Sequence, residues 1–497
     1  MATLSLANLS ALAPHVTVPS FERTALSAGI LHVGVGNFHR AHQAVYLDDL
    51  FKAGRDHDWA LIGAGVRPGD AVMREKLAAQ DWLTTVVELE PGANRARVIG
   101  SMIDFVEVTP GNAPLIAAMA DPRIRIVSLT VTEGGYFIDS ATGTFDHGHA
   151  EIQADSAAPD APRTVFGAMV AALNHRRAAG VAPFTVMSCD NLPGNGEAAR
   201  AAVVGVADLI DGALAKWIGA EVAFPNGMVD RITPSTTDAQ RTGLRERFGV
   251  EDAWPVFSEP FRQWVLEDHF PQGRPALEEA GVTFTDEVAA FELMKLRILN
   301  GGHAAIAYPS ALLDLVYAHD GMAHPLVSGF LAKLEREEIV PVVPPVPGVD
   351  LVDYVALIEQ RFANPEIGDT IARLCLDGSN RQPKFILPST RDRLAKGLPI
   401  TGLALESALW CRYLFGESES GASITIDDIH AARLRKAARA AKTQPLAFLA
   451  LDDIFGDLAA APVFQQAFAR ALSALWRDGT AATLERYLSL APGESLG

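Results

Sequence analysis

The stretch FELMKLRILNGGH, residues 291–303, places four polar side chains within an apolar helical pattern. On an ideal helix each residue advances about 100°, so Glu292, Lys295, Asn300 and His303 share one sector of about 140°. A solvated stripe is a common reason for such a pattern, but the surrounding leucines, isoleucine and phenylalanine indicate burial. Burial disfavours a charged ammonium, so a lysine in this setting can act as a general base.

The four residues spread over about 16 Å along the axis of a straight helix, too far for all of them to touch one small molecule. The reach of Lys295 and a distortion at Gly301 and Gly302 would narrow this gap. The pattern therefore predicts a buried, irregular helix with a reactive face.

Two other stretches offer partners for such a lysine. Asn191 follows the apolar run FTVMSC, and Asp230 lies in FPNGMVDRITP. Taken singly, Asn191 is typical of a strand-end cap and Asp230 of a loop carboxylate. Taken together, a lysine base and an asparagine donor are what alcohol oxidation needs, because the alkoxide formed before hydride departure must be stabilised.

A dinucleotide motif precedes these residues. ILHVGVGNFHRAHQAVYLDDLF (30–51) is typical of a strand, a glycine turn and a helix, in which Gly34 makes the tight turn and Gly36 lets a pyrophosphate approach. A plain strand-to-helix turn is the alternative, since the position of the third glycine is occupied by His39. The residues that we expect around the cofactor at this turn are Gly34, Gly36, Asn37, Phe38, His39 and Arg40.

The choice between NAD and NADP depends on the loop after the next strand. Asp70 would take the ribose hydroxyls of NAD, whereas Arg67 could accept a 2′-phosphate, or either could be a solvated charge. We expect NAD and leave NADP open. Thr132 and Glu133 end another apolar run before Gly-Gly, so this loop either borders the nicotinamide or simply turns the chain.

Several elements must position these residues. Apolar runs at 29–36, 59–66, 84–89, 124–132 and 184–192 alternate with amphipathic stretches, which predicts the strands of a parallel, doubly wound sheet. From about residue 286 helical periodicity dominates. The expected fold is an α/β Rossmann-like N-terminal domain (1–285) followed by a mostly α-helical C-terminal domain (286–497).

Composition narrows the class of protein. The net charge of −18 disfavours nucleic acid and anionic lipid as partners. The basic stretch HAARLRKAARAAK (430–442) is the one local exception, and a solvated helix face explains it better. Three widely spaced cysteines and the absence of a signal-peptide or membrane-span pattern lead us to expect a cytoplasmic protein without disulfides.

Five motifs, in order over nearly the whole chain, carry a resemblance to a known family. GVGNFHRAHQA, DNLPGNG, NGMVDRITP, KLRILNGGH and DGSNRQPKF resemble the polyol-specific long-chain dehydrogenases, most closely their mannitol-oxidising members. FHR after the glycines is itself part of that pattern. The resemblance implies metal-independent, NAD-dependent oxidation of a polyol secondary alcohol to a ketose, with D-mannitol to D-fructose expected first.

The resemblance also implies a role for each site residue. Lys295 would be the general base, with an oxyanion hole formed by Asn191 and Asn300. His303 and Asp230 would position the substrate, and Glu292 would gate proton passage to solvent. Polyol hydroxyls would be bound by Arg373 and Lys384, although Arg381 lies close to Lys384 in the chain. A monomer is expected.

Three alternatives stay open. The same chemistry could act on D-arabinitol, D-sorbitol or a hexonate, because spacing does not report hydroxyl stereochemistry. A zinc enzyme could use HRAH (39–42) and DHGH (146–149), although no third clustered ligand is evident. The third is a dinucleotide sensor without catalysis. The presence of Lys295 together with both asparagines argues against it, because a sensor does not need a base.

Overall fold

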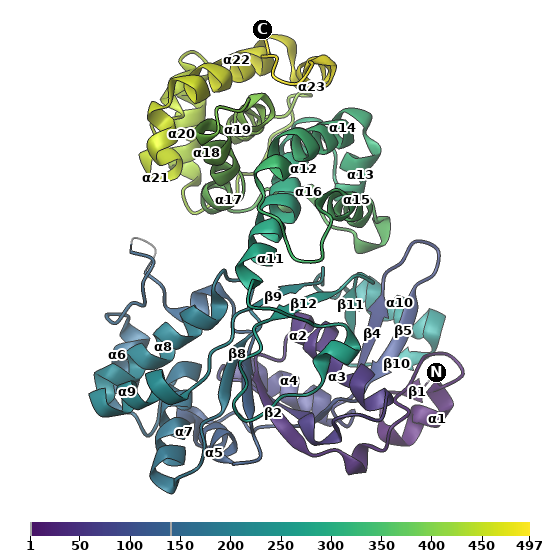
Figure 1. Cartoon of the computed structure of the whole chain (residues 1–497). Helices are drawn as coiled ribbons and strands as arrows, with labels where there is room; N and C mark the ends of the chain where they lie inside the picture. Colours follow the sequence, from purple (N-terminus) through teal and green to yellow (C-terminus); the bar gives the residue numbers. More distant parts are fainter. Residues whose placement is uncertain (1, 140–141) are drawn as a thin grey trace. The chain divides into compact units, whose positions relative to one another are not determined.

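The computed structural model describes residues 2–139 and 142–497 (Figure 1). The chain divides into two compact units, Met1–Ala289 and Ala290–Gly497. Every strand among the described residues belongs to the first unit, whereas the second is built of helices and their connections.

A five-stranded parallel sheet forms the centre of the first unit. Its strands, in spatial order, are β6 (Met102–Phe105), β3 (Ala60–Ala64), β2 (Ala28–Val33), β7 (Ile126–Leu129) and β8 (Thr185–Ser188). The first of these along the chain, β2, lies in the middle, so the strand order reverses between β2 and β7. Ligands of doubly wound sheets bind at such a switch point, beyond the carboxyl ends of the strands.

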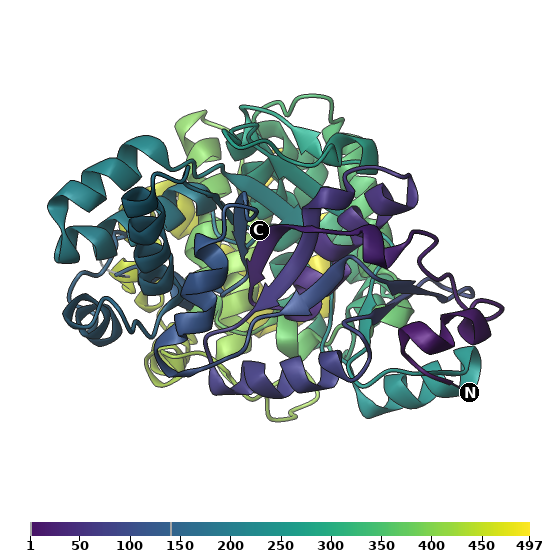
Figure 2. The same ribbon diagram turned by 90° about the horizontal axis from the view of Figure 1, so that it is seen from below.

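Apolar residues form this sheet because both of its faces are covered. Leu31 and Val33 of β2 pack into one core with residues of helices on one side, and Ile30 packs into a second core on the other side. Figure 2 shows helices on either side of these strands. The expected Rossmann-like α/β fold of the N-terminal half is confirmed.

Local signals set the helix ends of the first unit. The hydroxyl of Thr164 accepts the Gly167 N–H (3.0 Å) where α7 begins, and Gly180 ends α7 with a φ of 67°. The helices are α1 (Leu9–Leu12), α2 (Asn37–Ala41), α3 (Gln43–Lys52), α4 (Pro68–Ala78), α5 (Ala113–Ala120), α6 (Ala150–Ala157), α7 (Val165–Ala179), α8 (Asn195–Ile210), α9 (Gly212–Glu221) and α10 (Asp238–Phe248).

The assignment of residues 84–89 to the parallel sheet is wrong. This segment is β4 (Thr84–Glu88), which pairs antiparallel with β5 (Arg95–Ile99) and parallel with β11 (Val256–Ser258) in a separate sheet. A strand buried along most of its length looks the same in either sheet. The fifth parallel strand is instead β6, whose short apolar run is interrupted by exposed Asp104.

The remaining strands form two small sheets. One joins β9 (Gly227–Asp230), β12 (Gln263–Leu266) and β13 (Thr283–Phe284), and the other joins β1 (Ala2–Thr3) and β10 (Val250–Glu251). β9 runs antiparallel to β12, which places Asp230 opposite Gln263 at the end of β9.

The second unit packs around α19 (Thr401–Leu414), in which every residue from Gly402 to Leu414 is buried. An all-round buried helix is a central one. Its other helices are α12 (Gly301–Leu312), α13 (Ala318–Ala323), α14 (Pro325–Leu334), α15 (Leu351–Phe362), α16 (Ile371–Leu374), α17 (Gly378–Phe385), α18 (Leu387–Ala395), α20 (Ala431–Ala441), α21 (Asp452–Phe455), α22 (Pro462–Asp478) and α23 (Thr480–Ser489). α11 (Val288–Met294) leads into α12.

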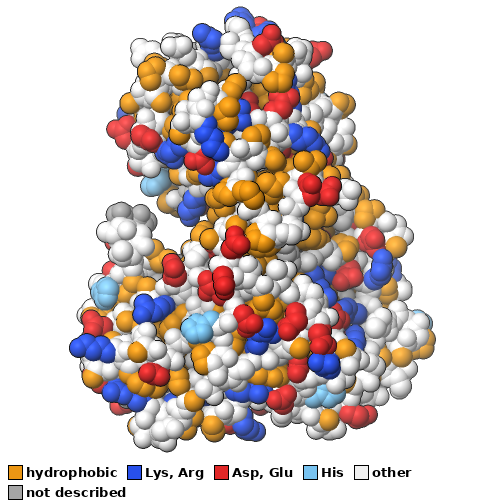
Figure 3. Space-filling view, viewed as in Figure 1, with side chains coloured by type: hydrophobic (Ala, Val, Ile, Leu, Met, Phe, Trp, Pro, Cys, Tyr) orange, Lys and Arg blue, Asp and Glu red, His pale blue; other side chains and the backbone are white. Residues whose placement is uncertain are grey.

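Charged side chains of both signs are interspersed over the face drawn in Figure 3. On the basic helix α20, Arg433 forms an intramolecular ion pair with Asp453 (2.5 Å). Within residues 2–139 and 142–497, no helix combines the length and apolarity needed to cross a membrane.

Candidate active site

The two glycines between β2 and α2 are glycines for different reasons. Gly34 has a φ of 101°, and a Cβ there would lie 2.1 Å from the carbonyl oxygen of Thr130, so the fold itself requires glycine. Gly36 has an ordinary φ of −79°, and a Cβ there would have the Gly34 oxygen at 3.9 Å as its nearest neighbour. Protein packing leaves room for a side chain at Gly36, as expected if the pyrophosphate of a ligand approaches the protein backbone there.

Arg40 braces this turn from inside. It is 1 % exposed, and its guanidinium donates to the Gly36 carbonyl (3.3 Å), to Asn37 Oδ1 (2.9 Å) and to the Trp254 carbonyl. Burial lowers the pKa of Arg40 to about 10. The positive charge thus lies beneath the turn and within reach of its backbone.

Two stacked imidazoles lie beside the turn. His39 stacks on His32 with ring centroids 3.5 Å apart, and His32 reaches Ser128 Oγ (2.8 Å) and Thr130 Oγ1 (2.9 Å). Burial lowers the pKa of His32 to about 3, and burial, followed by the neighbouring His32, lowers that of His39 well below its usual range. Both rings are therefore neutral. Neither nitrogen of His39 has a hydrogen-bond partner within the described protein.

Phe38 and Asp70 are two further predicted cofactor residues. Phe38 stacks on the His42 ring at 4.8 Å. Asp70 Oδ2 accepts the Arg67 N–H (2.9 Å) in the first turn of α4, directly after β3, while Arg67 itself is exposed. Asp70 therefore has a helix-capping role at the position where an acid for the ribose is expected.

The loops after β7 and β8 are joined by a residue that the sequence analysis did not single out. Asp190, 8 % exposed, accepts the Thr132 N–H on Oδ1 (2.8 Å) and the Val131 N–H on Oδ2 (3.0 Å). Thr132 has a φ of 68°, an unusual conformation for a β-branched residue. Thr132, Glu133 and Asn191 are exposed at this edge. The structure thus brings the two predicted loops together.

A buried amide, that of Asn195, connects this edge to the first residue of β9, the strand that Asp230 ends. The side chain of Asn195 donates to the carbonyls of Asp190 (3.1 Å) and Gly227 (2.7 Å) and accepts the Gly227 N–H (2.9 Å). Gly227 begins β9, and Asp230, buried, ends it. The segments that follow β7 and β8 and the first residue of β9 are therefore joined by one set of hydrogen bonds.

In the second unit, the distortion of the candidate helix lies one turn earlier than expected. Residues Lys295–Asn300 form a π-helical segment, whereas Gly301 has α-helical angles and begins α12. A π segment adds one residue to each turn, so the sector calculated for an ideal helix does not hold through it. Such segments are rare and occur frequently at functional sites.

The predicted side chains of this helix differ in burial. Lys295 is 7 % exposed, while Glu292 and Asn300 are half-buried. The His303 ring stacks on Phe362 at 4.1 Å. Burial lowers the pKa of His303 well below its usual range, with a further contribution from nearby arginines, so this imidazole is neutral.

The arginines that act on His303 are Arg373, Arg361 and Arg381. Arg373 forms an ion pair with Asp369 and is about half exposed, and Arg381 donates to the Leu374 carbonyl (2.8 Å). Lys384 is exposed on the same short helix as Arg381, α17. Arg361, which is buried, was missed because it lies outside every motif quoted above.

The histidines of HRAH and DHGH make separate contacts. His42 Nε2 lies 2.9 Å from the Gln263 carbonyl, and His149 Nδ1 accepts the Glu151 N–H (3.3 Å). Across the part of the chain that the structure describes, no group of three or more His, Cys, Asp or Glu side chains is arranged to hold a metal ion.

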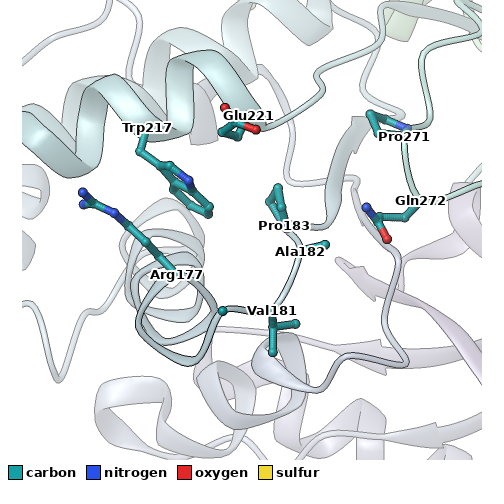
Figure 4. Close-up of a pocket in the computed structure, with 9 residues that line it drawn as sticks. Arg177, Val181, Ala182, Pro183, Trp217, Glu221, Pro271 and Gln272 are labelled. Atoms are coloured by element: carbon teal, nitrogen blue, oxygen red, sulfur yellow. The ribbon is translucent and has the colours of Figure 1, made fainter.

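A hollow of about 460 Å³ lies away from these residues, at the amino end of β8. Figure 4 shows the side chains of Arg177 and Trp217 on one side of it and Pro271 and Gln272 on the other. Ligands of parallel sheets bind at the carboxyl ends of the strands. The hollow is therefore not part of the candidate site.

Two family models cover most of the chain. The mannitol dehydrogenase Rossmann domain matches residues 28–279, and the mannitol dehydrogenase C-terminal domain matches residues 287–476. The chain belongs to the mannitol dehydrogenase family. The resemblance carried by the five sequence motifs is confirmed by these matches and by the relatives.

Relatives within the mannitol dehydrogenase family align over nearly their full length. Mannitol 2-dehydrogenase of Cereibacter sphaeroides is 62 % identical over 474 residues, which are 95 % of this chain and 99 % of that protein. The structure of Pseudomonas fluorescens mannitol 2-dehydrogenase in ternary complex with NAD and D-mannitol is 43 % identical, with a TM-score of 0.87, and covers 99 % of this chain and 100 % of that one. A substrate-free D-sorbitol dehydrogenase is 33 % identical, with a TM-score of 0.90, and covers 97 % and 100 %.

Proposed function

We propose that the chain is an NAD-dependent polyol dehydrogenase that oxidises a secondary alcohol to a ketose, with D-mannitol converted to D-fructose. The observation that carries this proposal is the match over 99 % of the chain to an enzyme whose structure contains both NAD and D-mannitol. The buried Lys295 on a π-helical segment supports it, because a polyol oxidation needs a base.

Lys295 takes the proton from the substrate hydroxyl in this proposal. Its side chain is largely removed from water, which favours the neutral amine that a base requires. Glu292, three residues earlier and half-buried, would pass that proton on to solvent.

Neutral donors stabilise the developing alkoxide. Asn191 and Asn300 would donate to it, because an amide N–H stabilises negative charge without competing for the proton. His303 and Asp230 would orient the substrate. The neutral state of His303 suits this role, since a neutral imidazole can both donate and accept a hydrogen bond.

The outer hydroxyls of the polyol would be bound by charged donors. Arg373 and Lys384 are proposed for this, and both are exposed. Arg381 is the alternative to Lys384, because it lies close enough to His303 to lower its pKa.

The fit of NAD to the first unit rests on the space at Gly36 and on the strand-end position of Asp70. We propose that Gly34, Gly36, Asn37 and the adjoining Phe38, His39 and Arg40 form or brace the pyrophosphate site, that Asp70 takes the ribose, and that Thr132 and Glu133 border the nicotinamide. NAD, when bound, accepts the hydride that leaves the substrate carbon. NADP is the second candidate cofactor, because Arg67 could bind its 2′-phosphate.

D-Sorbitol is the second candidate substrate. The 33 % identical D-sorbitol dehydrogenase has the same fold with a TM-score of 0.90, so the scaffold accommodates relatives named for either hexitol. D-Arabinitol and a hexonate are the remaining candidate substrates. We further propose a cytoplasmic monomer whose partners are the polyol and its ketose, with no nucleic acid.

The test is a matrix of substrates and cofactors. Purified protein is incubated with D-mannitol, D-sorbitol, D-arabinitol and a hexonate, each with NAD or NADP, in the presence and absence of a chelator. We expect reduced cofactor to form fastest with D-mannitol and NAD at an undiminished rate in chelator. Folded protein that binds NADH but turns over none of the four would support the sensor instead, and chelator-sensitive turnover would support the zinc enzyme.

A further inference from the structure

We infer that Asp190 is a positioning residue of the proposed dehydrogenase. Its carboxylate fixes the strained Thr132 loop against the strand end that carries Asn191. The inference rests on the proposed function. It adds to that function a residue that contacts neither the substrate nor the cofactor but holds two loops that do.

The geometry around the carboxylate is complete. Oδ1 accepts the Thr132 N–H (2.8 Å), and Oδ2 accepts the Val131 N–H (3.0 Å) and the Tyr136 hydroxyl (2.7 Å). Tyr136 Oη also lies 2.5 Å from Ser188 Oγ at the end of β8. One buried carboxylate therefore gathers both ends of the 131–136 loop onto the end of β8.

The loop needs such a clamp. Thr132 has a φ of 68°, which a β-branched residue adopts only when its surroundings enforce it. The two N–H groups that donate to Asp190 belong to this strained residue and to Val131 directly before it. Without the carboxylate, Thr132 would relax toward an ordinary conformation and move the exposed Thr132 and Glu133 side chains.

The same residue also holds Asn191. The Asp190 carbonyl accepts the Asn195 side-chain amide (3.1 Å) and the Leu192 N–H (2.9 Å), so both neighbours of Asn191 in the chain are anchored. Asn195 in turn binds Gly227 at the start of β9. Asp190 thus holds the segment of Asn191 with its backbone carbonyl and the 131–136 loop with its side chain.

The chain contains a matched control. Asp155, 1 % exposed, accepts the Arg163 N–H on Oδ1 (2.7 Å) and the Thr164 N–H and hydroxyl on Oδ2 (3.0 and 2.5 Å). This is the Asp190 pattern of two backbone N–H groups and one hydroxyl. None of its partners is a candidate site residue. Asp155→Asn therefore reports what the loss of such a clamp costs in stability alone.

The experiment compares Asp190→Asn, Tyr136→Phe and Asp155→Asn with wild type. An asparagine offers one acceptor oxygen and one NH2, so at least one loop N–H loses its bond whichever way the amide turns. We expect kcat for D-mannitol to fall at least thirtyfold in Asp190→Asn and about threefold in Tyr136→Phe, while the Kd for NADH changes by less than threefold. Asp155→Asn should keep its kcat within twofold at a comparable loss of thermal stability.

Hydrogen exchange of the peptide spanning residues 130–137 gives a readout that needs no turnover. Exchange should be faster in Asp190→Asn than in wild type and unchanged in Asp155→Asn. Unchanged exchange, or a kcat in both Asp190→Asn and Tyr136→Phe no lower than in Asp155→Asn, would overturn the inference. Faster exchange in Asp190→Asn, combined with a wild-type protein that oxidises no polyol, would support the positioning role of Asp190 and reject the proposed function instead.

Discussion

The two units hold their candidate residues by opposite means. In the first, Thr132, Asn191 and Asp230 lie on three segments, which the buried Asp190 carboxylate and the buried Asn195 amide join through hydrogen bonds to the backbone. In the second, Lys295 and Asn300 belong to one continuous helix whose own backbone supplies the rigidity, interrupted by a π segment. Residues on loops are held in place by hydrogen bonds from other segments, whereas residues on one helix are held by its own backbone and are redirected by a local change of pitch.

Several buried titratable groups of the two units respond to pH in opposite directions. The first buries neutral bases, with the pKa of His32 and that of His42 each lowered to about 3 by burial. The second buries neutral acids, with the pKa of Glu406 raised to about 8 and that of Glu335 raised well above its usual range, both by burial. These two histidines therefore lower the stability as the pH falls, and these two glutamates lower it as the pH rises. His303 of the second unit acts in the same direction as the histidines of the first.

The largest effect is expected when the proposed base of the second unit is removed and the cofactor residues of the first unit are left unchanged. Lys295→Ala removes the proposed base, and kcat for D-mannitol should fall by a factor of about 10² to 10⁴. NADH binding, measured by fluorescence titration, should be preserved because no cofactor residue is altered. An equal loss of both would make Lys295 a structural residue.

The second prediction concerns the two glycines of the first unit. Gly34→Ala should destabilise the protein by more than about 3 kcal/mol, because a strained backbone and a clash with the Thr130 main chain act together. Gly36→Ala should keep the melting temperature of wild type and weaken NADH binding at least about tenfold, which is 1.4 kcal/mol. Unchanged NADH affinity in Gly36→Ala would place the pyrophosphate elsewhere.

The third prediction uses the corresponding pair in the second unit. A Cβ at Gly302 would lie 2.6 Å from the fully buried Glu335 Oε1 and 3.2 Å from Phe362, so Gly302→Ala should lower the free energy of unfolding by about 1–3 kcal/mol. At Gly301 the nearest atom is at 3.4 Å, so Gly301→Ala should be neutral or stabilising by up to about 1 kcal/mol. Urea denaturation of the two variants measures the difference, and equal destabilisation would contradict it.

The fourth prediction tests the opposite pH dependence, and its effect is small within any one pH unit. Between pH 4.5 and 8 the folded state keeps a proton on Glu406 that the unfolded state has lost, so this residue lowers stability as pH rises. In Glu406→Gln the amide oxygen can still accept from Gln382, which donates to Glu406 Oε1 at 2.6 Å. The stability of the variant relative to wild type should therefore increase by up to about 1.4 kcal/mol per pH unit across that window. A pH-independent difference would show that Glu406 is ionised in the folded protein.

Sequence reasoning predicted the class of fold because its signal is local. Apolar runs bounded by turns identified four of the five strands of the parallel sheet. The partner of a buried strand is not a local property, so residues 84–88 were assigned to the wrong sheet. The strand β6 was missed because Asp104 interrupts a run of only four residues.

The candidate site was predictable where a side chain broke a pattern. Lys295 is conspicuous among leucines, and Gly36 follows a strand. Asp190 and Asn195 were missed because their importance lies in backbone partners that are distant along the chain, although both belong to the motif stretch that contains Asn191. The π segment at Lys295–Asn300 was not predicted, and a distortion was considered only at Gly301 and Gly302, because sequence gives no direct signal of helix pitch.

Isotope transfer tests the proposed reaction most directly. D-Mannitol carrying deuterium at C2 and C5, which are equivalent by symmetry, is oxidised with NAD, and both products are analysed by mass spectrometry. The proposed function predicts D-fructose together with one deuterium on the reduced nicotinamide. D-Mannose with unlabelled NADH would mean oxidation at the primary carbon and would contradict the proposal.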